Sequence, residues 1–325
     1  MRVQPGSQAL SKARVLVTGA TGFVGNALLP KLVTAGFRIR AVSRSPVRAA
    51  GDTTAIEWQS CSDIGDASVE GCDTLIHLAA RVHIMRETAQ DSLAAFRQVN
   101  VMVTERLARR AAAGGVRRFV FLSSIKVNGE ETRPDRPFFA DDVPAPEDAY
   151  GVSKYEAEQV LRQIAEETGM EVVVIRPPLV YGPGVKGNFR SMLDWLDRGV
   201  PLPLASLDNR RSFVGVDNLC DLILRCVTHP GAANQTFLVS DDQDLSAPDL
   251  LRMAADVLGR PARLWPFPPA LLEQMATLLG KGGIARRLCG NLQVDIGKTK
   301  SMLSWAPPVT AKDGLRRILD ERTAQ

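Results

Sequence analysis

Hydrophobic positions in the first half of the chain form short, nearly continuous runs, which alternate with longer stretches where apolar residues recur every three or four positions. A short apolar run between turn residues indicates a buried strand, and the longer period indicates an amphipathic helix. The expected strands cover residues 14–19, 38–44, 73–80, 117–124 and 170–178, and the expected helices cover residues 23–36, 91–115 and 150–169. Strands that alternate with helices predict an α/β fold with a doubly wound parallel sheet.

The pattern changes after Pro178, where short helical segments are separated by turns rich in proline and glycine, such as "PPLVYGPGVKGN" and "WPFPPA". We therefore expect two unequal domains. Residues 12–178 form the sheet domain, whose sheet is completed by later segments at about 211–240. Residues 179–325 form mainly a smaller α/β domain near the carboxyl ends of the strands, which is the edge where such sheets bind ligands.

Composition and charge narrow the function classes. The chain has 325 residues, 45% of them hydrophobic, and no apolar run reaches the roughly 18 residues of a membrane helix. The N-terminus lacks the apolar stretch of a signal peptide, so we expect a cytoplasmic protein without stable membrane insertion. The formal net charge of +4 comes without a dense run of Lys and Arg, which argues against nucleic acid and suits a small anionic ligand. Five scattered cysteines without a C-x-x-C pair suggest neither a disulfide framework nor a metal site.

The first candidate site is the stretch "LVTGATGFVGNAL", where Gly19, Gly22 and Gly25 follow a strand and open a helix. Glycines at such a turn permit a tight bend, close approach of the backbone to a pyrophosphate and close packing of helix on strand. A plain glycine-rich turn is the alternative. The spacing G-x-x-G-x-x-G is the one that short-chain dehydrogenases have.

A second candidate site lies downstream, where Tyr150 and Lys154 stand one turn apart at the start of a helix, and Ser124 ends the preceding strand. A tyrosine with a pKa of roughly 10 acts as acid or base near neutral pH only if a positive charge lowers that pKa. Lys154, together with a nicotinamide, would supply that charge. A lone Y-x-x-x-K pair also arises by chance; joined to the glycine turn, it predicts proton transfer at a hydroxyl or carbonyl oxygen.

With these elements the chain resembles the extended short-chain dehydrogenases/reductases of the NAD-dependent epimerase/dehydratase family. The resemblance rests on "TGATGFVG", "HLAA", "LSSIKVNGE", "YGVSK", "RPPLVYGPG" and "RRSFVGVDNLCDLI", and it covers nearly the whole chain. It implies a Rossmann-type fold, a catalytic triad of Ser124, Tyr150 and Lys154, and a structural and proton-relay role for Asn100. The residues expected at the cofactor, besides Tyr150 and Lys154, are Gly19, Thr21, Gly22, Phe23, Val24, Gly25, Ser43, Arg44, Asp63, Ile64, Leu78, Ala79, Ala80 and Pro177.

The resemblance also implies a UDP-sugar substrate. In family members that bind such substrates, an arginine that corresponds to Arg211 holds the diphosphate, and a cation suits two phosphates. A solvated Arg211 is the plain alternative, and Asn188 is equally well explained as a turn residue or as a sugar or phosphate contact. The candidate substrate contacts are Ser123, Ser124, Lys126, Tyr150, Asn188 and Arg211.

Three features of the sequence depart from the family pattern. Many members have an Asp at the end of the second strand, which accepts hydrogen bonds from the ribose hydroxyls of NAD. Ser43 and Arg44 stand there instead and suit a 2′-phosphate, so NADP(H) is favoured and NAD(H) remains open. Leu179 replaces a common ligand-binding Asn, and the short span from Asp63 to His77 leaves little room for a third helix.

The sequence therefore predicts an oxidoreductase that transfers hydride at C4 of a UDP-sugar. We favour reduction of a UDP-4-keto-6-deoxy-N-acetylhexosamine for surface polysaccharide, such as O-antigen. The sequence around Ser124 and Tyr150 resembles that of the bacterial branch of the family that reduces such sugars. The alternatives are a UDP-hexose or UDP-N-acetylhexosamine 4-epimerase with tightly bound NAD, a reductase of a non-sugar ketone, and a nonenzymatic NADP-sensing protein. A dehydratase is disfavoured because "IKVNGEE" lacks the Asp-Glu pair of those members.

Two questions stay open at this point. The apolar stretch 268–280 could be a lid, a dimer face or a membrane-surface helix, and its helical spacing favours packing as core or lid. Many relatives form homodimers through helices of the sheet domain, and nothing in the sequence tests this.

Overall fold

The computed structural model describes residues 13–47, 55–82, 92–185, 187–278, 282 and 288–323. Its main feature is a seven-stranded sheet in which every neighbouring pair of strands is parallel. In spatial order the strands are β3 (Ile56–Ser60), β2 (Arg38–Ser43), β1 (Arg14–Thr18), β4 (Thr74–His77), β5 (Arg118–Leu122), β6 (Glu171–Arg176) and β9 (Thr236–Leu238). The predicted doubly wound α/β fold is confirmed.

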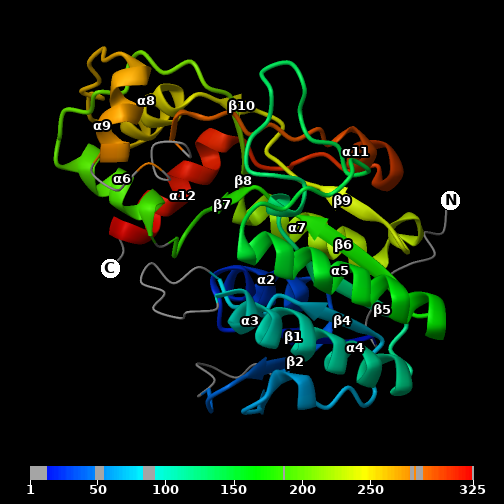
Figure 1. Cartoon of the computed structure of the whole chain (residues 1–325). Coiled ribbons are helices and arrows are strands. Elements are labelled where there is room, and N and C mark those ends of the chain that lie inside the picture. The colour runs from blue at the N-terminus through cyan, green and yellow to red at the C-terminus, as the bar shows by residue number, and fades with distance from the viewer. Residues whose placement is uncertain are drawn as a thin grey trace, which may run out of the picture.

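Helices cover both faces of this sheet, because successive residues of its buried strands point to opposite sides. The helices are α2 (Phe23–Thr34), α7 (Val216–Thr228), α3 (Ser92–Arg97), α4 (Val103–Ala113) and α5 (Ala149–Thr168). Val15 and Val17 of β1 belong to one apolar cluster with α2 and α7, whereas Leu16 belongs to a second cluster with α4 and α5. The two layers are visible in Figure 1.

The helix expected over 91–115 is described from Ser92 and contains a wide π-helical turn, η2 (Gln98–Met102), between α3 and α4. Such single turns inside α-helices are frequent at functional sites. Between Asp63 and His77 the chain forms only the 3₁₀ turn η1 (Ile64–Asp66) before β4, as the short span predicts.

The second lobe is built on a small sheet with the order β10 (Asp244–Leu245), β8 (Arg211–Gly215) and β7 (Leu179–Tyr181). Its apolar core is separate and includes Tyr181, Phe189 and Leu250. Of the segments at about 211–240, β9 joins the large sheet and β8 joins the small one. The remaining elements are α6 (Asn188–Asp197), α8 (Ala247–Val257), α9 (Pro269–Leu278), α11 (Gly297–Leu303), α12 (Ala311–Thr323), η3 (Ile125–Val127) and η4 (Pro230–Ala232).

No helix in the described part of the chain is long and apolar enough to cross a membrane. Leu271, Met275 and Leu278 of α9, within the stretch 268–280, are exposed.

Candidate active site

The glycine turn after β1 packs directly on the chain that follows β4. Gly19 has φ +69°, and a Cβ there would lie 2.7 Å from the backbone nitrogen of Ala79. A Cβ on Gly25 would lie 2.3 Å from the carbonyl oxygen of Gly19. Side chains at these two positions would clash with backbone atoms, so only glycine allows this tight turn, which leads into the N-terminus of α2, where backbone N–H groups suit an anion. These residues therefore fit the pyrophosphate of a dinucleotide.

Tyr150 and Lys154 lie in the first turns of α5, which Asp148 caps by accepting a hydrogen bond from Gly151 N at 2.7 Å. The ring of Tyr150 meets Phe96 of α3 edge to face, with centroids 5.9 Å apart. Lys154 is 1% exposed, and its Nζ lies 3.9 Å from the ring centroid of Phe121 at the end of β5.

Burial controls the ionisation of this pair within the protein. Removal of Tyr150 from water raises its pKa to about 12, with a further contribution from the nearby charge of Asp148. Burial lowers the pKa of Lys154 to about 7, and the carboxylate of Glu158 acts in the opposite direction. We expected Lys154 to lower the pKa of Tyr150. Instead, burial disfavours the charged form of each group, so that the pKa of Tyr150 is raised and the pKa of Lys154 is lowered.

Asn100 connects the catalytic helix to the loop that packs on the glycine turn. Its Oδ1 accepts from Arg81 N at 2.8 Å, and its Nδ2 donates to the carbonyl of Arg81 at 3.1 Å and to Ser153 Oγ at 3.0 Å. Ser153 Oγ in turn donates to the carbonyl oxygen of Tyr150 at 2.8 Å. The π-helical turn η2 holds Asn100, so a continuous chain of contacts runs from Gly19 to Tyr150.

His77 at the end of β4 belongs to the buried wall behind this pair. Its ring nitrogens lie 2.6 Å from Thr18 Oγ1 and 2.9 Å from Thr104 Oγ1, and its ring stacks on Phe121. Burial, with the nearby charge of Lys154, lowers its pKa to about 3, which keeps the imidazole neutral.

The two serines at the end of β5 have different environments. Ser124 is partly buried and caps η3, where its Oγ accepts from Lys126 N at 3.3 Å. Ser123 is 4% exposed, and its Oγ donates to Glu158 Oε1 at 2.5 Å. The structure thus commits the hydroxyl of Ser123 to a buried carboxylate, unlike the substrate contact that we expected.

The other residues expected at the substrate have partners within the protein or begin a helix. Lys126 Nζ pairs with Glu130 at 2.6 Å and also with Asp148. Arg211 Nη1 donates to the carbonyl of Gly290 at 2.9 Å, and Asn188 is the first residue of α6.

The residues expected around the adenine end lie at the end of β2 and after β3. Ser43 is buried, and its Oγ donates to the carbonyl of Ser45 at 2.6 Å, whereas Arg44 is exposed. Asp63 accepts from Gly65 N at 2.8 Å and pairs with Arg106, which lowers the pKa of the Asp63 carboxyl. The structure thus places Asp63 in an ion pair rather than free at the end of the strand.

The remaining residues expected at the cofactor lie at the same edge of the sheet. Thr21 is exposed, whereas Phe23, Val24, Ile64, Leu78, Ala79 and Ala80 are partly buried. The carbonyl oxygen of Pro177, directly after β6, accepts from Ile125 N at 2.9 Å.

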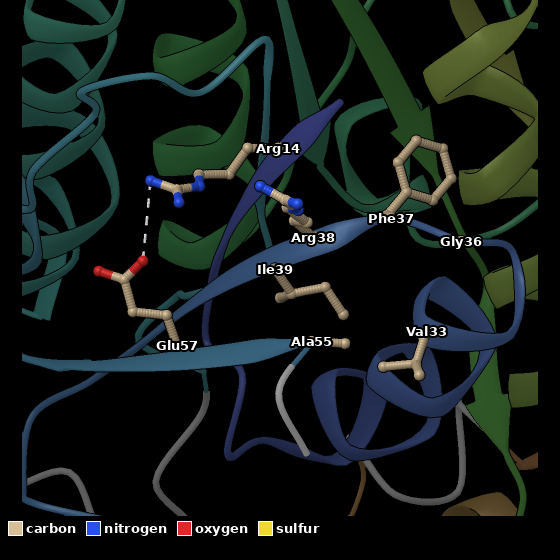
Figure 2. Close-up of a pocket in the computed structure, with 8 residues that line it drawn as sticks. All are labelled: Arg14, Val33, Gly36, Phe37, Arg38, Ile39, Ala55 and Glu57. Atoms are coloured by element: carbon tan, nitrogen blue, oxygen red, sulfur yellow. Dashed lines mark ion pairs between the residues drawn. The ribbon is translucent and has the colours of Figure 1, made fainter. Parts of the chain in front are cut away.

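A cavity of about 440 Å³ lies at the opposite edge of the sheet, where β1, β2 and β3 begin. Figure 2 shows Arg14 and Glu57 facing each other, 3.7 Å apart, with Phe37 on the other side of Arg38. None of the candidate catalytic residues lines this cavity. Among the described residues, no group of three or more His, Cys, Asp or Glu side chains could hold a metal ion.

Sequence reasoning missed Glu158 and Arg176, which are 0% and 1% exposed. The signal was present, because Glu158 falls on the same helical face as Lys154, Ala157 and Leu161, which are all buried. A carboxylate on an apolar helix face requires a partner inside the protein.

The parallel sheet, the glycine turn and the Tyr150–Lys154 pair define an extended short-chain dehydrogenase/reductase. The model of the NAD dependent epimerase/dehydratase family matches residues 15–240. The chain belongs to this family.

Individual relatives agree with this assignment. The chain is 42% identical over 309 residues to a UDP-glucose 4-epimerase of Vibrio cholerae, and the aligned region covers 93% of each chain. Its fold is similar to that of UDP-glucuronic acid 4-epimerase from Bacillus cereus in complex with NAD, with a TM-score of 0.77, 19% identity and coverage of 96% and 99% of the two chains. It is also similar to RMD from Pseudomonas aeruginosa complexed with NADPH, with a TM-score of 0.72, 25% identity and coverage of 96% and 100%.

Proposed function

We propose that the protein transfers hydride between a nicotinamide cofactor and C4 of a UDP-sugar. The observation that carries the proposal is the chain of contacts from Gly19 through Ala79, Arg81 and Asn100 to the helix of Tyr150 and Lys154. It couples a turn that fits a pyrophosphate to a tyrosine that can transfer a proton.

In the favoured direction, a 4-keto sugar is reduced to an alcohol. A nicotinamide cofactor held at the glycine turn would supply the hydride for the new C–H bond at C4. Tyr150 donates its phenolic proton to the C4 oxygen, so that the carbonyl becomes a hydroxyl. Ser124 donates a hydrogen bond to the same oxygen, and the charge of Lys154 stabilises the phenolate left on Tyr150.

The end of β2 favours NADP(H) over NAD(H). Within the described part of the chain, Arg44 is exposed and forms no ion pair, so its guanidinium is available to a 2′-phosphate. Ser43 occupies the position where a carboxylate would repel that phosphate. A one-way reductase that uses NADPH once per turnover is consistent with this end of the strand, and RMD is a structural relative complexed with NADPH.

The second candidate is a UDP-hexose or UDP-N-acetylhexosamine 4-epimerase. It is supported by the 42% identity to the Vibrio cholerae protein, which is named UDP-glucose 4-epimerase. An epimerase uses the same residues for the first half-reaction, then rotates the 4-keto intermediate and returns the hydride to the other face. It therefore needs a cofactor that stays bound. In both cases we propose that Arg211 binds the diphosphate, with Asn188 and Lys126 near the sugar.

Nucleotide analysis of the protein purified without added cofactor separates the two candidates. An empty protein that binds NADPH ahead of NADH, and that oxidises NADPH with a UDP-4-keto-6-deoxy-N-acetylhexosamine, supports the reductase. Stoichiometric bound NAD together with interconversion of UDP-hexose epimers supports the epimerase and overturns the reductase. Failure of both sugar assays, with wild-type protein that binds a nicotinamide cofactor, contradicts the UDP-sugar assignment.

A further inference from the structure

A buried polar cluster lies under the catalytic helix and is absent from the mechanism described so far. Its centre is Glu158, whose carboxylate accepts hydrogen bonds from Arg176 Nε at 2.9 Å and Nη2 at 2.6 Å. Ser123 Oγ donates to it at 2.5 Å, and Arg162 Nη2 at 3.3 Å. Arg176 also donates to Asn128 Oδ1 at 2.9 Å. The cluster therefore ties α5 to β5, to β6 and to the turn after Ser124.

Glu158 stands one helical turn after Lys154, on the face of α5 that packs against the sheet. Both side chains are at most 1% exposed, so little solvent screens the charge of one from the other. The carboxylate favours the charged form of Lys154, against the burial that lowers the pKa of this lysine. The Glu158 carboxylate, held by its hydrogen bonds, thus acts on Lys154 through space.

We propose that Glu158 is a positioning residue for hydride transfer: it keeps the Lys154 side chain protonated beside Tyr150, and Arg176 and Ser123 hold its carboxylate in place. The inference rests on the proposed function for the role of Lys154. Glu158 itself touches neither substrate nor reacting atoms.

The other groups around Lys154 cannot replace this carboxylate. Tyr150 is neutral near pH 7, since burial raises its pKa to about 12. His77, from β4, is also neutral, since its pKa is lowered to about 3. Arg176, from β6, is a buried cation and supplies no negative charge. If Glu158 loses its charge, three cations, Lys154, Arg176 and Arg162, remain around the site of this carboxylate, and Lys154 is the one that can give up a proton.

Two substitutions separate charge from hydrogen bonding. Glu158→Gln keeps the shape and the acceptor oxygen but removes the charge, whereas Glu158→Asp keeps the charge but shortens the side chain and weakens the contacts with Arg176. Glu156→Gln is the matched control, because it makes the same change on the same helix at a partly exposed pair with Arg97. All three chains are first compared by circular dichroism and thermal unfolding.

The measurement is an NMR titration of the Lys154 side chain in protein labelled with ¹³Cε-lysine, with the resonance assigned from a Lys154→Met variant. We expect the titration midpoint of Lys154 to fall by at least about one pH unit, a tenfold change in its ionisation constant, in Glu158→Gln. Glu158→Asp and Glu156→Gln should leave the midpoint near that of the wild type.

An unchanged midpoint in folded Glu158→Gln overturns the proposal, and so does an equal shift in Glu158→Asp, because the effect would then follow packing rather than charge. The titration needs neither cofactor nor substrate, so its result does not depend on whether the UDP-sugar assignment holds. With an active enzyme, the pH profile adds a second test: activity that depends on charged Lys154 should be lost at lower pH in Glu158→Gln than in the wild type.

Discussion

The catalytic side of the site and the side expected to hold the sugar nucleotide are built differently. Asn100 and Lys154 are buried and held by contacts that cross from one element of the sheet domain to another. Arg211 and Lys126, by contrast, are partly exposed, and their cationic groups bond to the carbonyl of Gly290 and to the carboxylates of Glu130 and Asp148.

This difference separates the chemistry from the choice of ligand. The sheet domain holds the residues proposed for acid–base chemistry with partners that no ligand needs to supply. On the substrate side, the present bonds of Arg211 and Lys126 must be replaced by contacts with a diphosphate. The free-energy cost of breaking them, and the selectivity for the ligand, therefore arise when the ligand binds. Changes on the catalytic side should therefore lower kcat or stability, and changes on the substrate side should mainly raise KM.

The largest expected effect follows from Tyr150→Phe. Without the phenolic proton, hydride transfer at C4 should fall about a thousandfold, within the range for loss of a general acid. Cofactor affinity, measured by fluorescence titration, should change little. Tyr155→Phe is the control on the same helix, because its hydroxyl bonds only to Gln159 at 2.9 Å among the described residues. Equal activity of the two variants would contradict the assigned role of Tyr150.

Acidification should destabilise the folded protein through His77, which lies in the buried wall of the catalytic side. His77 is neutral in the folded protein, with a pKa lowered to about 3 from 6.5, so below pH 6.5 the unfolded chain binds a proton that the folded chain does not. Stability is therefore lost as the pH falls. Between pH 7.5 and pH 5 this group should cost about 2 kcal/mol.

Guanidinium chloride unfolding at the two pH values measures this loss. A His77→Gln variant should show a smaller difference between them, even if it is less stable at both. His229→Gln is the comparison, because this histidine is partly exposed and its pKa is also lowered. An equal pH dependence in wild type and His77→Gln would contradict the neutral, buried histidine.

On the substrate side, Arg211→Met should raise KM for the UDP-sugar about tenfold with little change in kcat, as expected for the loss of one charge-assisted contact to phosphate. The neighbouring, exposed Arg210 is the control in Arg210→Met. Steady-state kinetics at saturating cofactor distinguish the two parameters. A drop in kcat at unchanged KM would place Arg211 on the catalytic side instead.

The smallest effect is expected for Lys126→Met, which removes the cation between Glu130 and Asp148. The charge of Asp148 raises the pKa of Tyr150, and without Lys126 it should do so more strongly. Lys126 therefore differs from Arg211, because its partner Asp148 acts on Tyr150, and the effect should appear in kcat rather than in KM. Because this cluster is partly exposed, we expect only about a threefold loss of kcat. Lys298→Met removes a surface cation paired with Asp141 at 2.7 Å and should have no effect on rate.

The sequence predicted the parts of this site that depend on local pattern. Turn glycines at fixed spacing and a tyrosine one turn before a lysine are readable because helix and strand geometry fix where such residues point. The exclusion of a third helix before β4 could also be read from the length of the span alone.

The rest depends on what packs against each residue in three dimensions. Ser123 and Ser124 are adjacent, and the sequence does not show that a buried Glu158 captures the first hydroxyl. The π-helical turn at Asn100 breaks a pattern that reads as one helix. The pKa of Tyr150 is raised because Phe96 and its surroundings bury the ring, and the spacing of Tyr150 from Lys154 does not reveal this.

The most direct test of the account is to follow the hydride itself. The wild-type protein is incubated with NADPH that carries deuterium at the transferred position of C4 and with a UDP-4-keto-6-deoxy-N-acetylhexosamine, and the product is examined by NMR and mass spectrometry. The account predicts deuterium at C4 of the sugar, dependent on Tyr150. A sugar without deuterium, from protein shown to bind NADPH, would contradict it.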